Sequence, residues 1–450
     1  MVGISNIGAE AQKVNSVKAE KDRIEKEAFF CTTKELSRLG LEQIPTQFQS
    51  HKHLIYSSPA TLAFNSPGAE GFGVKRAGLA VPDSIMLIVA PGCCGRNTSL
   101  ISSMKEYNDR FYYLMMDETD IVTGRHLKKI PKAVEEICSV CPKKPSVVMI
   151  CITCVDALLG TDMDRVCKKA EERVEIPVRP CYMYALTREG RKPPMVHVRQ
   201  SLYSLLEPGK KKGNVVNLLG FFSPLVGDCE IYDLLHSAGV KTIHEISRCK
   251  DYMEYQTMSE ANFNLVLHHE ARFAAEDFHN RLQIPFIELR RLYQIDKIEN
   301  QYHALGNALG VAFYDEKYKK QAEDALEKFR QKCPDASFAI GECLNADPFE
   351  LSLALIRYGF SVPEIYGTIT VENFTYIRSL AKISPETKVF SNMEPTMIYY
   401  DPAKSDVNLA IGKDACYYHP DCPYVMWNGE EQPYGYAGVR RLFEQLLEVV

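Results

Sequence analysis

Short apolar runs alternate with longer stretches of helical periodicity from about residue 84 onward. Apolar runs of about four to eight residues are typical of strands buried in a parallel sheet, and the amphipathic stretches between them predict the connecting helices. The predicted strands fall into three sets: 84–90, 112–117, 145–153 and 175–183; then 214–222, 241–246, 263–269 and 284–289; then 336–343, 362–369, 388–393 and 407–412. The pattern predicts an α/β protein of three tandem doubly wound, Rossmann-like parallel-sheet domains.

The boundaries between these domains follow from the same pattern. The segment "EPGKKKGN" separates the first two sets of strands and has the Gly- and Lys-rich composition of a solvated linker. We therefore expect an N-terminal helical or extended segment over 1–83, a first domain over 84–208, a second over 209–330 and a third over 331–450.

Composition and charge exclude several classes of protein. The 450 residues carry a net charge of -5 with both signs mixed, without the basic stripe that nucleic-acid binding requires. No apolar run approaches the roughly 18 residues of a membrane span, and the N-terminal residues lack the apolar core of a signal peptide. We expect a cytoplasmic protein that binds neither nucleic acid nor a membrane.

Fifteen cysteines are many for such a chain. Their odd number and scattered positions weigh against a disulfide framework, so thiolates that bind metal become the hypothesis to test. Most are expected to be small buried apolar residues. This group comprises Cys31, Cys138, Cys141, Cys167, Cys181, Cys229, Cys249, Cys333 and Cys343.

Four other cysteines follow two predicted strands of the first domain. Cys93 and Cys94 lie in "VAPGCCGRNTSL" after the first strand, and Cys151 and Cys154 lie in "ICITCVDALLGTDMDRV" at the end of the third. The carboxyl ends of parallel strands meet at one edge of a sheet, so two to four of these thiols are predicted to converge there. A lone Cys-x-x-Cys also fits a redox pair or a zinc half-site, but cysteines from several loops favour an iron-sulfur cluster.

The linked order of "GAEGFGVKRAGLAVPDSIMLIVAPGCCG", "DETDIVTGRHLKKIPKAVEEI" and "CVDALLGTDMDRV" resembles the nitrogenase component 1 family. The resemblance continues through "FNLVLHHEARFAAEDFHNRLQIPFIEL" and "EQPYGYAGVRRLFEQL", and so covers roughly residues 50–450. It implies three doubly wound domains and cluster ligands at Cys93 and Cys154. A third family cysteine is replaced by Asn65 or Ser66, which favours a four-iron [4Fe-4S] cluster over an eight-iron [8Fe-7S] one, with Cys94 and Cys151 as the candidate replacement ligands.

The same resemblance implies that the usual molybdenum-iron cofactor is not held in the standard way. His268 or His269 stands where the family has a cofactor cysteine, and the region of the cofactor histidine reads "YVMWNG" around Met426. A second metallocluster or a tetrapyrrole stays open as the bound group. Cys416, His419 and Cys422 form a Cys-x-x-His-x-x-Cys loop that is either a polar loop or a metal site.

The resemblance implies a function as the catalytic subunit of a nitrogenase-like reductase. Electrons would come from an ATP-dependent iron-sulfur reductase protein through a cluster shared with a homologous subunit, in a homodimer or an α2β2 heterotetramer. His268 or His269 is the predicted proton donor. Because alternate strand residues face opposite sides of a sheet, only one of the two is expected to face the cleft. The alternative is a non-catalytic scaffold for metallocluster assembly or transfer.

Overall fold

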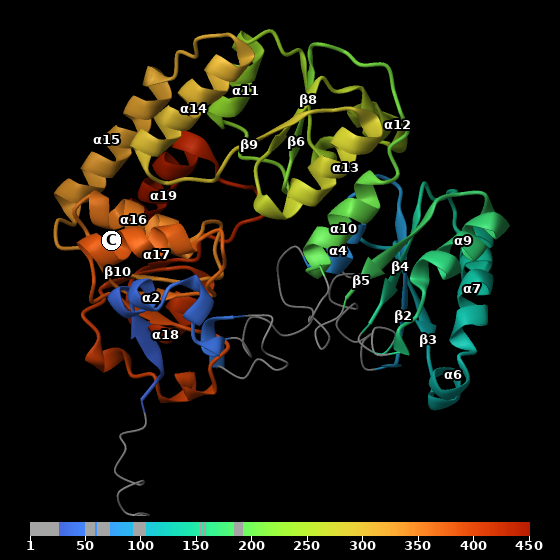
Figure 1. The fold of residues 1–450 in the computed structure, drawn as a ribbon, viewed down its shortest axis with the longest axis horizontal. Helices are drawn as coiled ribbons and strands as arrows, with labels where there is room; N and C mark the ends of the chain where they lie inside the picture. The colour runs from blue at the N-terminus through green and yellow to red at the C-terminus, as the bar shows by residue number, and fades with distance from the viewer. Residues whose placement is uncertain are drawn as a thin grey trace, which may run out of the picture.

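The computed structural model describes residues 27–49, 59–60, 73–92, 105–153, 155, 159–183 and 192–450. Figure 1 shows three lobes, each built around one sheet and its helices. All twelve predicted strands are present, each shorter than its apolar run by one to several residues. The predicted fold class is confirmed.

The first lobe holds a parallel sheet in the order β3-β2-β4-β5, on the right of Figure 1. Helices α7 and α9 bury an apolar stripe on one face of this sheet, and α4 and α10 pack on the other side. Its elements are β2 (Ile85–Ala90), β3 (Phe111–Met115), β4 (Val148–Ile152), β5 (Val178–Tyr182), α4 (Val74–Gly78), α6 (Glu118–Thr123), α7 (His126–Val140), α9 (Met163–Val174) and α10 (Pro194–Tyr203).

The second lobe repeats this arrangement with a parallel sheet in the order β7-β6-β8-β9, at the top of Figure 1. Its strands are β6 (Val215–Leu219), β7 (Thr242–His244), β8 (Phe263–Val266) and β9 (Phe286–Glu288). Its helices are α11 (Glu230–Ser237), α12 (Tyr252–Gln256) and α13 (Arg272–Leu282), and α14 (Ile295–Leu309) leads toward the third lobe. The carboxyl ends of β6 and β8 are adjacent in this sheet, which positions the candidate site.

The third lobe has a sheet in the order β1-β12-β11-β10-β13-β14. Its strands are β10 (Ser337–Ile340), β11 (Ser361–Tyr366), β12 (Lys388–Phe390), β13 (Leu409–Ile411) and β14 (Tyr424–Val425), all parallel, and β1 (Phe30–Thr32), which pairs antiparallel with β12. Its helices are α2 (Thr33–Leu39), α15 (Glu316–Lys332), α16 (Pro348–Arg357), α17 (Phe374–Ile383), α18 (Lys413–Tyr418) and α19 (Gly435–Val449). Residues 30–39, expected in a separate N-terminal segment, thus complete the last sheet.

The last helix ties the second and third lobes together through the "PYGYAG" motif. The buried Glu230 carboxylate accepts hydrogen bonds from the backbone N–H groups of Tyr436 at 2.6 Å and Ala437 at 3.0 Å, at the N-terminus of α19. A helix N-terminus favours an anion because its first N–H groups have no partner within the helix. Gly435 has a φ of 58°, and a Cβ there would collide with the Glu230 carboxylate, so this position requires glycine.

Candidate functional site

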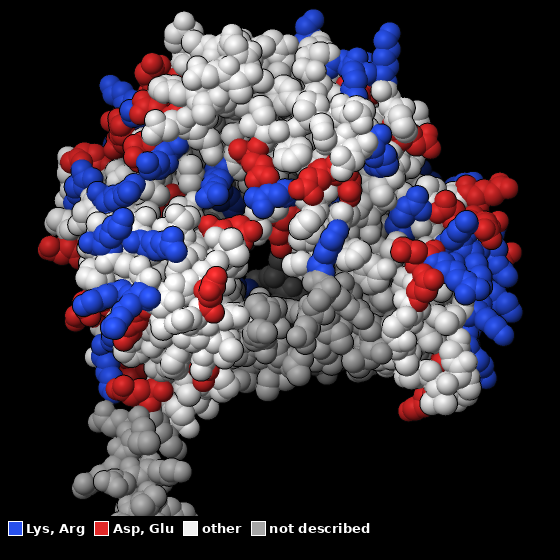
Figure 2. All heavy atoms as spheres, viewed as in Figure 1, with Lys and Arg blue, Asp and Glu red and all other residues white. Residues whose placement is uncertain are grey.

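The candidate site is the carboxyl edge of the second sheet, where the turns after β6 and β8 pack together. Gly220 follows β6 with a φ of 142°, and a Cβ at this position would lie 2.8 Å from the backbone nitrogen of His268. Glycine therefore lets the two turns meet. Figure 2 shows this side of the molecule hollowed between the lobes, with acidic and basic side chains along the border that the described residues form.

His268 and His269 lie side by side at this edge. Their rings stack with centroids 4.5 Å apart and an interplanar angle of 28°, and Phe221 lies against His268 in an edge-on contact at 5.7 Å. The expectation that the two histidines face opposite sides is wrong. The strand ends at Val266, so the histidines belong to the turn leading into the 3-10 helix His269–Ala271, where strand alternation no longer applies.

The hydrogen bonds of His268 engage only one of its ring nitrogens. Nδ1 is 3.4 Å from the backbone nitrogen of Glu270, which donates to it, and 3.7 Å from Oε2 of the Glu270 carboxylate. Nε2 has no hydrogen-bond partner within the described ranges, and 33% of the side chain is exposed. His268 therefore presents a ring nitrogen that is available to a ligand.

Arg199, on α10, holds this turn in place through hydrogen bonds. Its side chain is 5% exposed and donates to Glu270 Oε2 at 2.8 Å and to the Gly220 carbonyl at 2.6 Å. A buried guanidinium is tolerated when its donors are paired in this way. Arg199 thus fixes both the Glu270 carboxylate and the turn after β6.

Arg291, just after β9, brings a second cation to the site. Its guanidinium carbon lies 4.3 Å from the centroid of the Phe221 ring, and Nη2 donates to Gln432 Oε1 at 2.6 Å. The buried Nε makes no hydrogen bond within the part of the chain that the structure describes. Burial, followed by the charges of Arg199, His269 and Arg291, holds the pKa of His268 well below its usual value. The His268 imidazole is therefore neutral near pH 7.

The Cys416, His419 and Cys422 loop has a different environment. His419 is buried, and its Nε2 lies 2.8 Å from the Tyr400 hydroxyl and 3.1 Å from Glu364 Oε2. Burial raises the pKa of the Cys416 thiol to about 12, which disfavours the thiolate that binds metal. The Cys422 thiol contacts the Val407 carbonyl at 3.6 Å.

These three side chains do not form a metal site in the structure. Among the described residues, no group of three or more His, Cys, Asp or Glu side chains is placed to hold a metal ion. The only ring nitrogen of His419 with a recorded contact is already hydrogen-bonded within a buried polar network. The metal interpretation of this loop has no support in the described geometry, because His419 Nε2 and the Cys422 thiol already have partners inside the lobe.

The predicted iron-sulfur edge of the first lobe lies largely outside the described residues. The residues outside the described ranges include Cys93, Cys94 and Cys154, whose roles stay predictions. Cys151 is described and differs from the expectation. It lies within β4, paired in register with Cys181 on β5, and is completely buried. Its thiol faces the apolar core rather than a turn, so a role as a cluster ligand has no support from this position.

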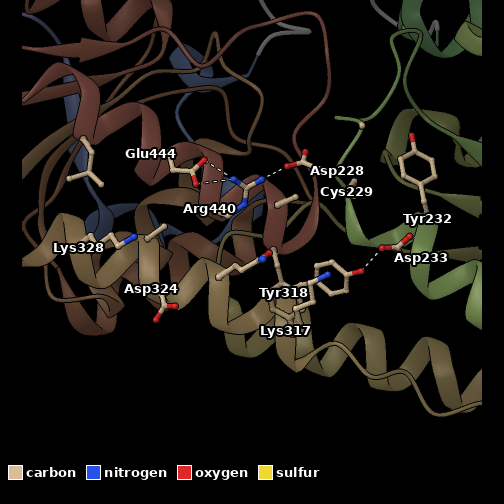
Figure 3. A pocket seen from close by; sticks show the side chains of 16 residues that line it. Asp228, Cys229, Tyr232, Asp233, Lys317, Tyr318, Asp324, Lys328, Arg440 and Glu444 are labelled. Carbon is tan, nitrogen blue, oxygen red and sulfur yellow. Dashed lines mark hydrogen bonds and ion pairs between the residues drawn. The ribbon is translucent and has the colours of Figure 1, made fainter.

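The groove in Figure 3 lies elsewhere, between α11, α15 and α19. It has a volume of about 640 Å³, and several of its polar side chains pair with one another. Arg440 contacts both Glu444 and Asp228, and Tyr318 contacts Asp233. None of the predicted site residues lines it.

Sequence reasoning missed Arg199, Glu270 and Arg291. Glu270 and Arg291 carried a weak signal, since charged residues directly follow β8 and β9 in "HHEAR" and "ELRRL". Arg199 carried none, because it reaches Glu270 across 71 positions of sequence.

The chain is similar to known proteins along most of its length. The family described as "Nitrogenase component 1 type Oxidoreductase" matches residues 70–450. The nitrogenase iron-molybdenum cofactor biosynthesis protein NifE of Sinorhizobium fredii is 25% identical over 418 residues, covering 87% of this chain and 82% of that protein. NifE of Clostridium pasteurianum is 26% identical over 257 residues, covering 55% of this chain and 54% of that protein.

A solved structure shares the fold. "Nitrogenase Cp1 at pH 6.5" superposes with a TM-score of 0.68 at 18% identity, covering 88% of this chain and 92% of that chain. Within the described ranges, no helix is both long and apolar enough to cross a bilayer.

Proposed function

Because the chain belongs to the nitrogenase component 1 type oxidoreductase family, we propose that it is a non-catalytic scaffold that holds a metallocluster at the carboxyl edge of its second sheet during cluster assembly or transfer. The observation that carries this proposal is the state of His268. It is neutral, partly exposed and has a ring nitrogen without a partner among the described residues.

This state suits a metal ligand better than a proton donor. A general acid works best when its pKa lies near the working pH, whereas the pKa of His268 is held well below its usual value. A metal ligand needs the neutral imidazole, and binding through Nε2 would require the ring proton to move to Nδ1, which in the structure accepts the Glu270 N–H. The contrast favours the scaffold over the reductase subunit, in which His268 would have to deliver protons.

The side chains around His268 also fit an anionic metallocluster, which the scaffold would carry. Arg199 and Arg291 both lie near enough to His268 to lower its pKa. The charge of Arg199 is balanced by Glu270, so Arg291 is the cation that could attract a sulfide-rich cluster. When bound, the cluster would supply metal ions that accept the imidazole lone pair. His268 would bind the cluster, Arg291 would orient it, and Phe221 would exclude water from one side of the imidazole ring.

The relatives supply independent support. NifE of Sinorhizobium fredii and of Clostridium pasteurianum are both named as cofactor biosynthesis proteins. From the resemblance to the family we further propose that a homologous subunit covers a [4Fe-4S] cluster held by Cys93 and Cys154. An ATP-dependent iron-sulfur reductase protein would be a second partner.

The test combines metal analysis with turnover. Protein purified without oxygen should be brown and contain iron and sulfide, and His268→Ala should lose the fraction of iron held in the cleft. His303→Ala is the matched control, because His303 is an exposed histidine on α14. With an ATP-dependent iron-sulfur reductase the protein should not sustain substrate reduction, yet it should release its cluster to a cluster-free acceptor. Sustained turnover would instead establish the reductase subunit.

A further inference from the structure

We infer that Cys138 and Cys141, at the carboxyl end of α7 in the first lobe, form a reversible disulfide by exchange with a low-molecular-weight disulfide. This modification site lies apart from the candidate site on the second sheet, so the inference does not rest on the proposed function. It arises from one arrangement: two partly exposed cysteines, three positions apart, lie at the end of a helix beside the hydroxyl of Tyr112.

Both thiols are accessible from solvent. The sequence predicts buried apolar roles for Cys138 and Cys141, and the structure corrects this, because each is only partly buried and Val140 between them is 66% exposed. Cys151 and Cys181 provide the contrast. They lie opposite each other on β4 and β5 but are completely buried. A dissolved disulfide can therefore reach the first pair and not the second.

The end of the helix gives the pair the geometry that a disulfide needs. Residues three apart in an α-helix have Cα atoms about 5 Å apart, within the range of about 4.4–6.8 Å found in disulfides. Their Cβ atoms must approach each other by about 1–2 Å. Cys141 caps α7 with a ψ of 132°, and its N–H donates to the Ile137 carbonyl at 3.0 Å. Since the chain has already left the helix at Cys141, rotation there supplies this movement.

Tyr112, on β3, distinguishes the two thiols. Its hydroxyl lies 3.1 Å from Sγ of Cys141. This bond, followed by burial, raises the pKa of Tyr112 to about 12, so the phenol keeps its proton and can donate it in a hydrogen bond to a Cys141 thiolate. Burial, followed by the charge of Cys141, raises the pKa of Cys138. Cys141 is therefore the thiol that reacts first, and Cys138 reacts second.

The exchange takes place in two steps. The Cys141 thiolate attacks one sulfur of the dissolved disulfide, so that a mixed disulfide forms, the original sulfur–sulfur bond breaks and one thiol leaves. Cys138 then loses its proton and attacks Sγ of Cys141, and the second thiol leaves. Two electrons pass from the two cysteines to the dissolved disulfide, and the two departing thiolates take up the two protons.

A zinc half-site is the other common use of a Cys-x-x-Cys pair. Structural zinc needs two further ligands. Among the described residues, no third His, Cys, Asp or Glu side chain is placed to complete such a site. The pair therefore fits thiol chemistry better than metal binding.

The experiment incubates the full-length protein under argon with glutathione and oxidised glutathione in varied ratio, followed by acid quenching, alkylation, trypsin digestion and mass spectrometry. Trypsin cleaves after Lys132 and Lys143, so both thiols lie in one peptide, residues 133–143. We expect this peptide to lose two hydrogen atoms and to regain them with dithiothreitol. In Cys138→Ser the glutathione adduct on Cys141 should persist about a hundredfold longer, because the second attack is lost.

Cys333 is the matched control within the same chain. It also caps the carboxyl end of a helix, α15, and is also followed by proline, but the residue three positions earlier is Arg330. Cys333 should therefore stop at the glutathione adduct. Two separate adducts at Cys138 and Cys141, or two free thiols under conditions that modify Cys333, would overturn the inference. A bound zinc ion that blocks oxidation until a chelator removes it would also overturn it. The wild-type peptide decides the outcome even if Cys138→Ser unfolds.

Discussion

Two histidines invite comparison, His268 after β8 in the second lobe and His419 at the end of α18 in the third. Both lie in segments that the sequence marked for metal chemistry. His419 is buried and bonded through Nε2 to Glu364 and Tyr400, whereas His268 is one-third exposed and its Nε2 has no hydrogen-bond partner among the described residues. The comparison teaches that residue type and spacing do not define a ligand. A histidine can act as a ligand only if the lone pair of its ring nitrogen is not already engaged in a hydrogen bond within the protein.

The largest difference between the two histidines should appear in stability. His419→Ala leaves the Glu364 carboxylate buried without its imidazole, and we expect a loss of about 3 kcal/mol, seen as a lower thermal unfolding midpoint. His268→Ala should cost less than about 1 kcal/mol, because it removes one long hydrogen bond from a partly exposed side chain. Equal losses in the two variants would break the comparison.

A second test addresses the contact between the two lobes at Glu350. This carboxylate on α16 accepts hydrogen bonds from the Tyr293 N–H at 2.9 Å and from Gln294 Nε2 at 2.9 Å. Burial raises the pKa of Glu350 from 4.5 to about 7, despite these bonds. The folded state thus keeps the proton to higher pH than the unfolded state does, and this stability is lost as pH rises through about 7.

Glu350→Gln should remove this pH dependence. Between pH 5.5 and 8 the wild type should lose about 2 kcal/mol that the variant keeps, measured as the difference between their unfolding midpoints across pH. Glu448→Gln, at an exposed position on α19, is the control and should follow the wild type. A Glu350→Gln variant with the wild-type pH profile would show that Glu350 stays ionised in the folded protein.

A smaller effect than that of His419→Ala is expected from Tyr400→Phe. The Tyr400 hydroxyl lies 2.6 Å from Glu364 Oε2 and 2.8 Å from His419 Nε2, so the variant removes one donor while keeping the Glu364–His419 contact. We expect a loss of about 1 kcal/mol in unfolding experiments. Tyr424→Phe, at a tyrosine that is 42% exposed, should be neutral. A loss as large as that of His419→Ala would mean that the tyrosine, rather than the imidazole, stabilises the carboxylate.

The sequence predicted the strands better than the contacts between them. Each central strand is an apolar run whose burial on both faces leaves a local signal. The short strands β1 and β14 were missed because they have two or three residues and are defined by distant partners. Similarly, the positions of His268 and His269 after β8 were predictable. Their stacking was not, because it depends on where the strand ends.

The same limit applies to the supporting residues of the site. Arg199 reaches Glu270 from a helix of the first lobe, and Arg291 reaches Phe221 from the turn after another strand. Such contacts arise from packing between elements that are distant in sequence, and the local pattern carries no information about that packing. The Cys-x-x-His-x-x-Cys loop shows the opposite. Its spacing was easy to recognise in the sequence, but in the folded protein His419 is part of a buried hydrogen-bond network.

The pairing of β1 with β12 has a consequence for how the chain acquires its structure. Phe30 lies opposite Phe390, so a strand made at the start of synthesis waits for a partner made about 360 residues later. Contacts this distant in sequence close large loops and slow folding, and the unpaired strand edge is exposed to wrong partners in the meantime. The first two lobes have sheets formed from contiguous sequence and can fold during synthesis. The third needs both β1 and the distant β12 before its sheet is complete, which makes it the step at which a folding assistant would act.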